Sequence, residues 1–184
     1  MKKLLDIEKT LIRNFTPISS NTERLNLMVR SAFNGLIDPH SASHISELGD
    51  LSSMNTLKWI KTKMENSEEG RIILKDKPTV TEETVNFNKL ASFPENTLGY
   101  YYYRYMSGNK FTPNERPIAK YVPDMELAYI CQRYKETHDF YHVLLGYEPS
   151  LLHEVSVKWF EALHLRLPSS SFASIFGCFT LNAS

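Results

Sequence analysis

Hydrophobic residues recur every three or four positions along most of the chain, which is the spacing of one face of an α-helix. Near the start, four such residues predict an amphipathic first helix within an N-terminal segment of residues 1–24: Leu4, Ile7, Leu11 and Phe15. Further helices are expected at residues 25–36, 41–51, 54–66 and 100–106, the last capped by Asn96 or Thr97 and ended by Gly108. Residues 70–76 fit either a strand or a helix end, and residues 111–122 are expected to form a loop.

The clearest helix is predicted for residues 124–145. Asp124 is a favourable N-cap, Pro123 blocks extension upstream, and Gly146 is a favourable stop. The face that this helix should bury is formed by Leu127, Ile130, Tyr134, His138, Tyr141 and Leu145.

A second helix follows closely, with Ser150 as its N-cap and Pro168 ending it. Because the loop between the two helices has only a few residues, residues 124–167 should form an antiparallel helical hairpin. Without repeats, low-complexity runs or a break in composition, the chain is expected to be a single all-α domain over residues 1–184.

Composition narrows the classes of function. The 184 residues include 21 Lys and Arg against 21 Asp and Glu, and a formal net charge of zero argues against a nucleic-acid partner. Two cysteines are too few for a disulfide framework or a cysteine-rich zinc module. An uninterrupted apolar run of about 18 residues, as a membrane-spanning helix needs, is absent. The chain is therefore expected to be soluble or peripheral to a membrane.

A candidate metal site lies on the predicted hairpin. His138 and His142 are four residues apart on one helical face, Asp139 adjoins that face, and Glu154 follows His142 after eleven residues. An antiparallel return would bring Glu154 opposite the histidines. Two imidazoles and two carboxylates suit Zn²⁺, with Fe²⁺ or Mn²⁺ as alternatives.

The alternative interpretation of these histidines is ordinary packing or surface exposure. However, both lie on the apolar stripe, where each uncompensated polar group would cost roughly 1–3 kcal/mol. A shared ion explains several such groups on one buried face better than chance does. The pattern differs from the H-E-x-x-H sequence of zinc proteases, because Asp139 has a shorter side chain than the glutamate that serves as their base.

The sequence around this site resembles the ubiquinone (coenzyme Q) biosynthesis family, which carries the pattern H-D-x-x-H-x11-E. The similarity includes the run R-Y-K-E-T-H-D-F-Y-H-V-L-L-G from Arg133 and the segment V-K-W-F-E-A-L after Glu154. Further similar segments are residues 34–39, 47–50, 70–78, 98–100 and 122–130, so the match covers roughly residues 28–176.

The resemblance implies an all-helical protein that binds zinc through His138, Asp139, His142 and Glu154. It also implies a carbon–carbon lyase that removes the C1 carboxyl of a polyprenylated 4-hydroxy-3-methoxybenzoate. Such a protein would lie on the matrix face of the mitochondrial inner membrane, bind a polyprenylated aromatic lipid and organise the other ubiquinone-making enzymes. The chain ends earlier than is usual for the family and has no clear transit peptide. The sequence leaves open whether it associates with copies of itself.

Two other functions are compatible with the same residues. In a non-catalytic scaffold or lipid-presenting protein, four protein ligands would close a structural metal site, whereas a catalytic site keeps one position open. A helical metal-dependent hydrolase would instead have a polar, basic pocket above the ion. The lyase requires an apolar pocket with aromatic walls. The tyrosine-rich segment 99–106 is expected mainly to pack in the core, with a place in the wall of such a pocket as the alternative.

Several histidines and tyrosines near these segments receive a more ordinary interpretation. His40 and His44 lie in a polar, helix-starting segment and are expected at the surface. His153 adjoins Glu154 but faces another way, so it is left out of the site. Tyr134 and Tyr141 share the inward face and are expected mainly to pack in the core.

Overall fold

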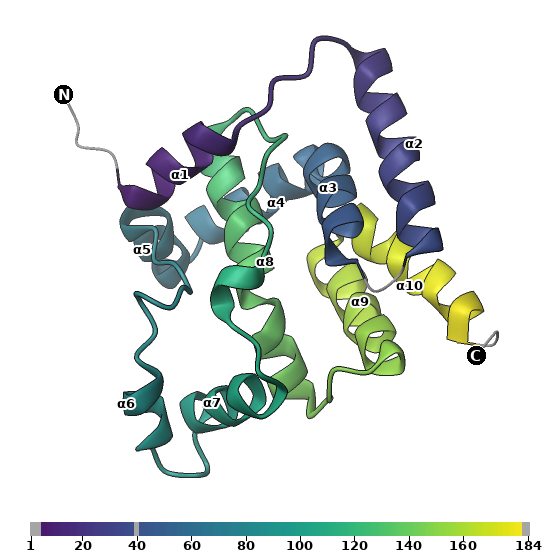
Figure 1. Ribbon diagram of the computed structural model, residues 1–184. Helices are drawn as coiled ribbons and strands as arrows, with labels where there is room; N and C mark the ends of the chain where they lie inside the picture. Colours follow the sequence, from purple (N-terminus) through teal and green to yellow (C-terminus); the bar gives the residue numbers. More distant parts are fainter. Residues whose placement is uncertain (1–4, 39–40, 182–184) are drawn as a thin grey trace.

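Every regular element in the computed structural model, which describes residues 5–38 and 41–181, is helical (Figure 1). This confirms the all-α class that hydrophobic spacing predicts. In chain order the elements are α1 (Asp6–Asn14), α2 (Asn21–Ile37), α3 (Ala42–Ser52), α4 (Met54–Glu65), α5 (Glu68–Asp76), α6 (Phe87–Ala91), α7 (Leu98–Asn109), the 3₁₀ turn η1 (Pro113–Glu115), α8 (Met125–Leu145), α9 (Leu151–Leu165) and α10 (Pro168–Leu181).

Helix α8 is the central element. Figure 1 shows it running through the middle of the molecule, with α1 and α5 on one side, α3, α9 and α10 on the other, and α4 crossing behind it. Leu11 of α1 and Leu57 of α4 are buried against Leu127 and Ile130 of α8. The ends of α8 follow the sequence prediction: Asp124 Oδ1 accepts a hydrogen bond from Leu127 N at 2.9 Å, and Gly146 has a φ of 69°.

Residues 70–76, for which the sequence allows strand or helix, belong to helix α5. Ser67 caps this helix, since its hydroxyl accepts a hydrogen bond from Gly70 N at 3.0 Å. Glu68 and Glu69 occupy the first turn, where carboxylates interact favourably with the helix dipole. The capping serine and the two acidic residues are the local signals that decide between the two alternatives.

Three details of the predicted helices are corrected. Gly108 does not end the aromatic helix, because α7 continues to Asn109 and Lys110 supplies the left-handed cap with a φ of 59°. Pro168 follows α9 but also begins α10, a position where proline lacks only an N–H that would be unpaired anyway. Leu145, predicted to be buried, is 36% exposed at the end of α8.

Helices α9 and α10 lie on the other side of α8 from the hydrophobic cluster that α1, α4 and α8 form. A short segment, residues 146–150, connects α8 to α9, and Ser150 Oγ caps α9 by accepting a hydrogen bond from His153 N at 3.3 Å. Helix α9 packs mainly against α10, which also contacts α3 and α2.

In the part of the chain that the structure describes, no helix has the length and apolar content needed to cross a bilayer.

Candidate metal centre

Three of the four predicted ligands come together between α8 and α9. His138 and His142 lie one turn apart on the buried side of α8, with exposed fractions of 4% and 0%. Their Nε2 atoms are 3.3 Å apart. His138 Nε2 lies 3.4 Å from Glu154 Oε2, and His142 Nε2 lies 3.1 Å from Glu154 Oε1. One potential ligand atom from each residue lies within 4.8 Å of the others. The predicted return of Glu154 to the histidines is therefore what the structure shows.

Hydrogen bonds on the far side of each ring determine which nitrogen faces Glu154. His138 Nδ1 lies 2.7 Å from Glu161 Oε1, and His142 Nδ1 lies 3.3 Å from the backbone oxygen of Tyr147. Because a carboxylate and a carbonyl can only accept, each Nδ1 must carry a proton. In the neutral rings both Nε2 atoms then present lone pairs toward each other and toward Glu154.

This arrangement fits a bound cation. Two Nε2 lone pairs and a carboxylate converge on one small volume, and a divalent ion would satisfy all three. Two imidazoles with one carboxylate form a common catalytic zinc set, with a fourth position left for water or substrate. Among residues 5–38 and 41–181, His138, His142 and Glu154 are the residues that meet these geometric requirements.

Asp139 is not brought into this group. Its carboxylate forms a two-point ion pair with Arg116, in which Arg116 Nε donates to Oδ2 at 3.2 Å and Nη2 donates to Oδ1. The Asp139 side chain is only 2% exposed, so its end of the pair lies within the protein. The structure thus gives Asp139 a contact that its position next to His138 does not indicate.

A buried network that sequence reasoning missed supports His138. Glu161 on α9 is fully buried, and its Oε2 accepts hydrogen bonds from Tyr134 Oη at 2.8 Å, Lys158 Nζ at 2.9 Å and Ser170 Oγ at 2.7 Å. Glu161 follows Glu154 by seven residues, two helical turns, so both carboxylates lie on one face of α9. That spacing is the signal that could have identified it.

Charges around the site favour a cation beside His138. Burial and the Lys158 ammonium lower the pKa of His138, but the carboxylates of Glu161 and Glu154 outweigh them and leave it raised. Burial raises the pKa of Glu154, yet its contacts with His138 and His142 and the nearby Lys158 ammonium hold it well below its ordinary value. Burial likewise raises the pKa of Glu161, but the Lys158 ammonium and His138 bring it well below its ordinary value. Glu154 and Glu161 are therefore ionised at neutral pH.

The centre opens onto a cavity of about 390 Å³. His138 and Glu154 form part of its wall, together with Arg116, Lys135 and Lys158. The remainder of the wall is largely apolar and comes mainly from α2, α3, α9 and α10, including Leu36, Ile45, Val155, Phe172, Ala173 and Phe176. The cavity therefore joins a charged end at the candidate metal centre to an apolar region.

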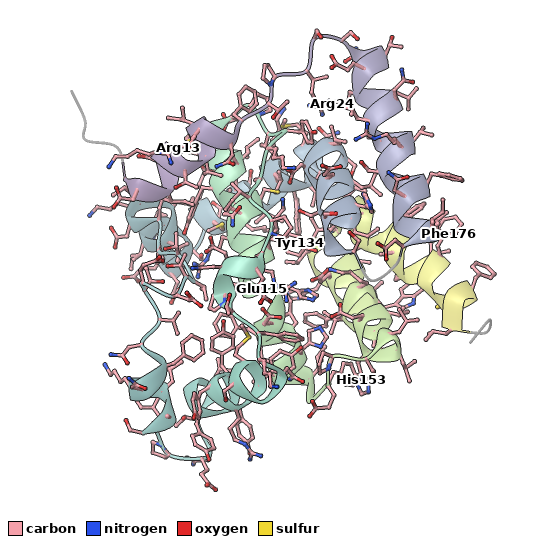
Figure 2. All side chains as sticks on the ribbon, in the orientation of Figure 1. Arg13, Arg24, Glu115, Tyr134, His153 and Phe176 are labelled. Atoms are coloured by element: carbon pink, nitrogen blue, oxygen red, sulfur yellow. The ribbon has the colours of Figure 1, made fainter. Side chains whose placement is uncertain are left out.

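The other aromatic residues mostly pack as the sequence suggests. Tyr134 lies near the centre of the molecule, where its hydroxyl serves the Glu161 network, whereas His153 lies at the edge (Figure 2). Tyr141 packs on Phe160. In α7, Tyr102 is buried against Phe140, and no residue of α7 forms part of the wall of this cavity.

Of the other histidines, the sequence predicts a surface position for His40 and His44. His44, predicted to lie at the surface, is half-buried on α3. His40 falls outside the described residues.

A crystal structure with a similar fold is that of a Nostoc punctiforme protein assigned to ubiquinone biosynthesis. It matches with a TM-score of 0.63 and 18% identity, over 90% of this chain and 75% of that chain. At this low identity the match supports the fold alone. This structural match does not depend on the spacing of hydrophobic residues in the sequence, and it gives the same all-α architecture.

Sequence comparisons identify the family. A mitochondrial ubiquinone biosynthesis COQ4 homolog of Paramecium tetraurelia is 47% identical over 142 residues, covering 77% of this chain and 68% of the relative. The mitochondrial homolog of Aedes aegypti is 38% identical, and the match covers 98% of this chain and 66% of the relative. The mitochondrial homolog of Rattus norvegicus is 37% identical, and the match covers 88% of this chain and 61% of the relative. The chain thus spans about two thirds of these relatives. Since the family model for the coenzyme Q (ubiquinone) biosynthesis protein Coq4 matches residues 14–184, the chain belongs to the Coq4 family.

Proposed function

We propose that this chain acts in ubiquinone biosynthesis by removing the C1 carboxyl of a 4-hydroxy-3-methoxy-5-polyprenylbenzoate at a divalent metal ion, with Zn²⁺ as the first candidate. The proposal rests on one observation: His138, His142 and Glu154 converge beside a cavity whose wall includes His138 and Glu154 and combines a basic end with an apolar region. Membership of the Coq4 family supplies the pathway, and the cavity is compatible with a lipid-tailed aromatic acid.

The number of ligands favours a catalytic over a structural metal. Three protein ligands leave one coordination position free, whereas a structural zinc site is closed by four. Glu154 is 41% exposed and lies in the cavity wall, so the free position can face the cavity. A fourth protein ligand from Asp139 would require its ion pair with Arg116 to break.

The lining of the cavity favours the lyase over a phosphate-ester hydrolase. A hydrolase should have a largely polar pocket above the ion, whereas apolar side chains of four helices form most of this wall. A polyprenyl tail can occupy the apolar part while the aromatic acid remains at the basic end. Substrate and tail would then fill one continuous space.

Each part of the site has a separate task in this proposal. Glu161 and the Tyr147 carbonyl hold the two imidazoles with Nε2 directed at Glu154. The apolar wall excludes water from the reacting ring and thereby strengthens electrostatic interactions within the cavity. A bound divalent ion would orient the substrate carboxylate. As CO₂ leaves, the electron pair of the broken C–C bond stays on the ring, and a proton from solvent takes the place of the carboxyl at C1.

We further propose that the protein works on the matrix side of the mitochondrial inner membrane and organises the other enzymes of the pathway. The relatives are named as mitochondrial proteins. Because no described helix could cross a bilayer, attachment would be peripheral. Exposed apolar side chains on α2 and α10, such as Phe33 and Phe179, are available for contact with lipid or with partner proteins.

Metal analysis of the purified chain tests the centre. The wild type should contain close to one equivalent of zinc, and both His142→Ala and Glu154→Ala should lose it. His153→Ala is the matched control, because His153 adjoins Glu154 but directs its Nδ1 to the Glu148 carbonyl. Release of labelled CO₂ from a carboxyl-labelled polyprenylated 4-hydroxy-3-methoxybenzoate then tests the reaction. A folded wild type without metal, or a metal-loaded protein that releases no CO₂, would contradict the proposal.

A further inference from the structure

Arg116 lies in the wall of the same cavity as the candidate ligands His138 and Glu154. It follows η1 in a loop that is held in place by buried side chains: Gln132 Oε1 accepts from Ala119 N at 2.9 Å, and Asp50 Oδ2 accepts from Lys120 N at 2.7 Å. The Arg116 side chain is 23% exposed. Its position is thus fixed by the fold while one side of it remains accessible from the cavity.

The ion pair with Asp139 occupies only part of the guanidinium group. Nε and Nη2 bind the two carboxylate oxygens, whereas Nη1 makes no hydrogen bond to any residue that the structure describes. A guanidinium group has five N–H donors in a planar fork, so a second edge stays available. That edge matches the geometry of a second carboxylate.

The distribution of charge around the cavity suits an anionic ligand. Three cationic residues, Arg116, Lys135 and Lys158, contribute to the wall, against one carboxylate, Glu154. The carboxylates that pair with the cations are buried behind the wall: Asp139, Asp50 and Glu161.

The two lysines already have close partners. Lys135 Nζ lies 2.6 Å from Asp50 Oδ1, and Lys158 Nζ donates to Glu161 Oε2 and to Tyr134 Oη. Of the three cations, Arg116 alone keeps a planar pair of donors available to a ligand in the cavity. It is therefore the best placed to hold a carboxylate.

We propose that Arg116 binds the carboxylate of an amphiphilic aromatic acid in this cavity, and that Asp139 is the positioning residue that holds Arg116 in place. The assignment rests on the proposed function for the class of substrate. It gives the aspartate of the H-D-x-x-H run a task other than metal binding: Asp139 holds the arginine in the wall of the cavity that His138 and Glu154 also line. The acid would then be held between the arginine and the metal centre, with its tail in the apolar region.

Two probes that differ only in the carboxylate test this assignment: 3-decyl-4-hydroxybenzoate and 2-decylphenol. Binding is measured by titration calorimetry on the full chain after dialysis against a chelator, so that the readout is independent of metal and of activity. The wild type should prefer the benzoate. Arg116→Gln should weaken benzoate binding about tenfold or more, as expected for loss of a charge-assisted pair, and leave the phenol within about twofold.

Arg71→Gln is the matched control, because Arg71 lies exposed on α5, outside the wall of this cavity, where its Nη1 donates to the Glu65 carbonyl at 3.0 Å. It should bind both probes as the wild type does. Arg116→Lys should recover part of the benzoate preference, since it keeps the charge but not the fork. Asp139→Asn should reduce the preference as well, because the arginine loses its anchor.

The outcomes separate a binding role from a structural one. If Arg116→Gln weakens both probes equally, the arginine only maintains the fold and the assignment is overturned. If the wild type binds both probes alike and Arg116→Gln changes neither, the assignment falls while the proposed substrate class survives. If the wild type binds neither probe, the substrate class is wrong, and the assignment fails with it.

Discussion

Glu161 Oε1 lies 2.7 Å from His138 Nδ1, in a contact that is buried on both sides. This contact joins α8 to α9 and fixes the proton of the imidazole on Nδ1, so that Nε2 faces Glu154. Glu161 carries out this task while its other oxygen accepts hydrogen bonds from Tyr134, Lys158 and Ser170. One carboxylate therefore both orients a candidate ligand and holds together three helices, α8, α9 and α10.

Glu161→Gln should weaken metal binding about 10–100-fold, because the His138 ring loses its charged acceptor. It should also lower the free energy of unfolding by about 3 kcal/mol, since Lys158 is left in a largely buried position without its counter-charge. Zinc titration and urea unfolding measure the two effects. Ser170→Ala removes only a neutral donor to the same carboxylate and should change metal affinity little. Equal zinc affinity in Glu161→Gln and the wild type would show that this contact does not orient the ligand.

Local sequence signals predict the elements that carry the site. Asp124 and Gly146 bracket α8, Ser150 starts α9, and the four-residue spacing of His138 and His142 places both rings on one face. These features depend on residues close together in the chain, which is why they can be read without a structure. Predicting that Glu154 meets the histidines requires only the further assumption that a short loop reverses the chain between the two helices.

The rest of the site depends on contacts between distant segments. Arg116 and Asp139 are 23 residues apart, and the arginine lies in a proline-containing loop that has no periodic pattern to place it. The cavity is built from helices that pack across the molecule, such as α3 and α10. Hydrophobic spacing states which face of a helix is buried, but not which helix covers it. The sequence therefore groups Asp139 with the ligands through its position beside His138 and through the H-D-x-x-H-x11-E pattern, neither of which indicates its ion pair with Arg116.

Gly70 and Gly108 offer a matched pair of glycine-to-alanine changes on helices. A Cβ atom at Gly70 would lie 2.2 Å from the backbone oxygen of Met64, whereas one at Gly108 would meet nothing within 4 Å. Gly70→Ala should lower the free energy of unfolding by about 2 kcal/mol or more, because backbone must shift. Gly108→Ala should raise it by up to about 1 kcal/mol through helix propensity. Chemical denaturation checks both, and an unchanged stability of Gly70→Ala would contradict the close approach of α4 and α5.

The two cysteines should differ sharply in reactivity. Cys131 is 2% exposed, its Sγ donates to Asp50 Oδ1 at 3.3 Å, and burial raises the pKa of its thiol, so little thiolate forms. Cys178 on α10 is exposed. Ellman's reagent at pH 8 should therefore label one thiol per folded chain quickly and two in denaturant. Cys178→Ser should abolish the fast phase, and a fast phase that persists in this variant would show that Cys131 is accessible.

Filling the apolar part of the cavity should separate lipid binding from metal binding. Ala173 of α10 lies in the cavity wall, so Ala173→Phe would place a ring where the tail of a substrate is expected. Affinity for 3-decyl-4-hydroxybenzoate should fall about tenfold or more, since loss of several buried methylenes costs at least that much. The zinc content should stay unchanged, because His138, His142 and Glu154 come from other helices. Leu163→Phe adds a ring at a position that is 77% exposed on α9 and should alter neither property. Undiminished binding of the decyl probe to a folded Ala173→Phe protein would place the tail elsewhere than between α3, α9 and α10.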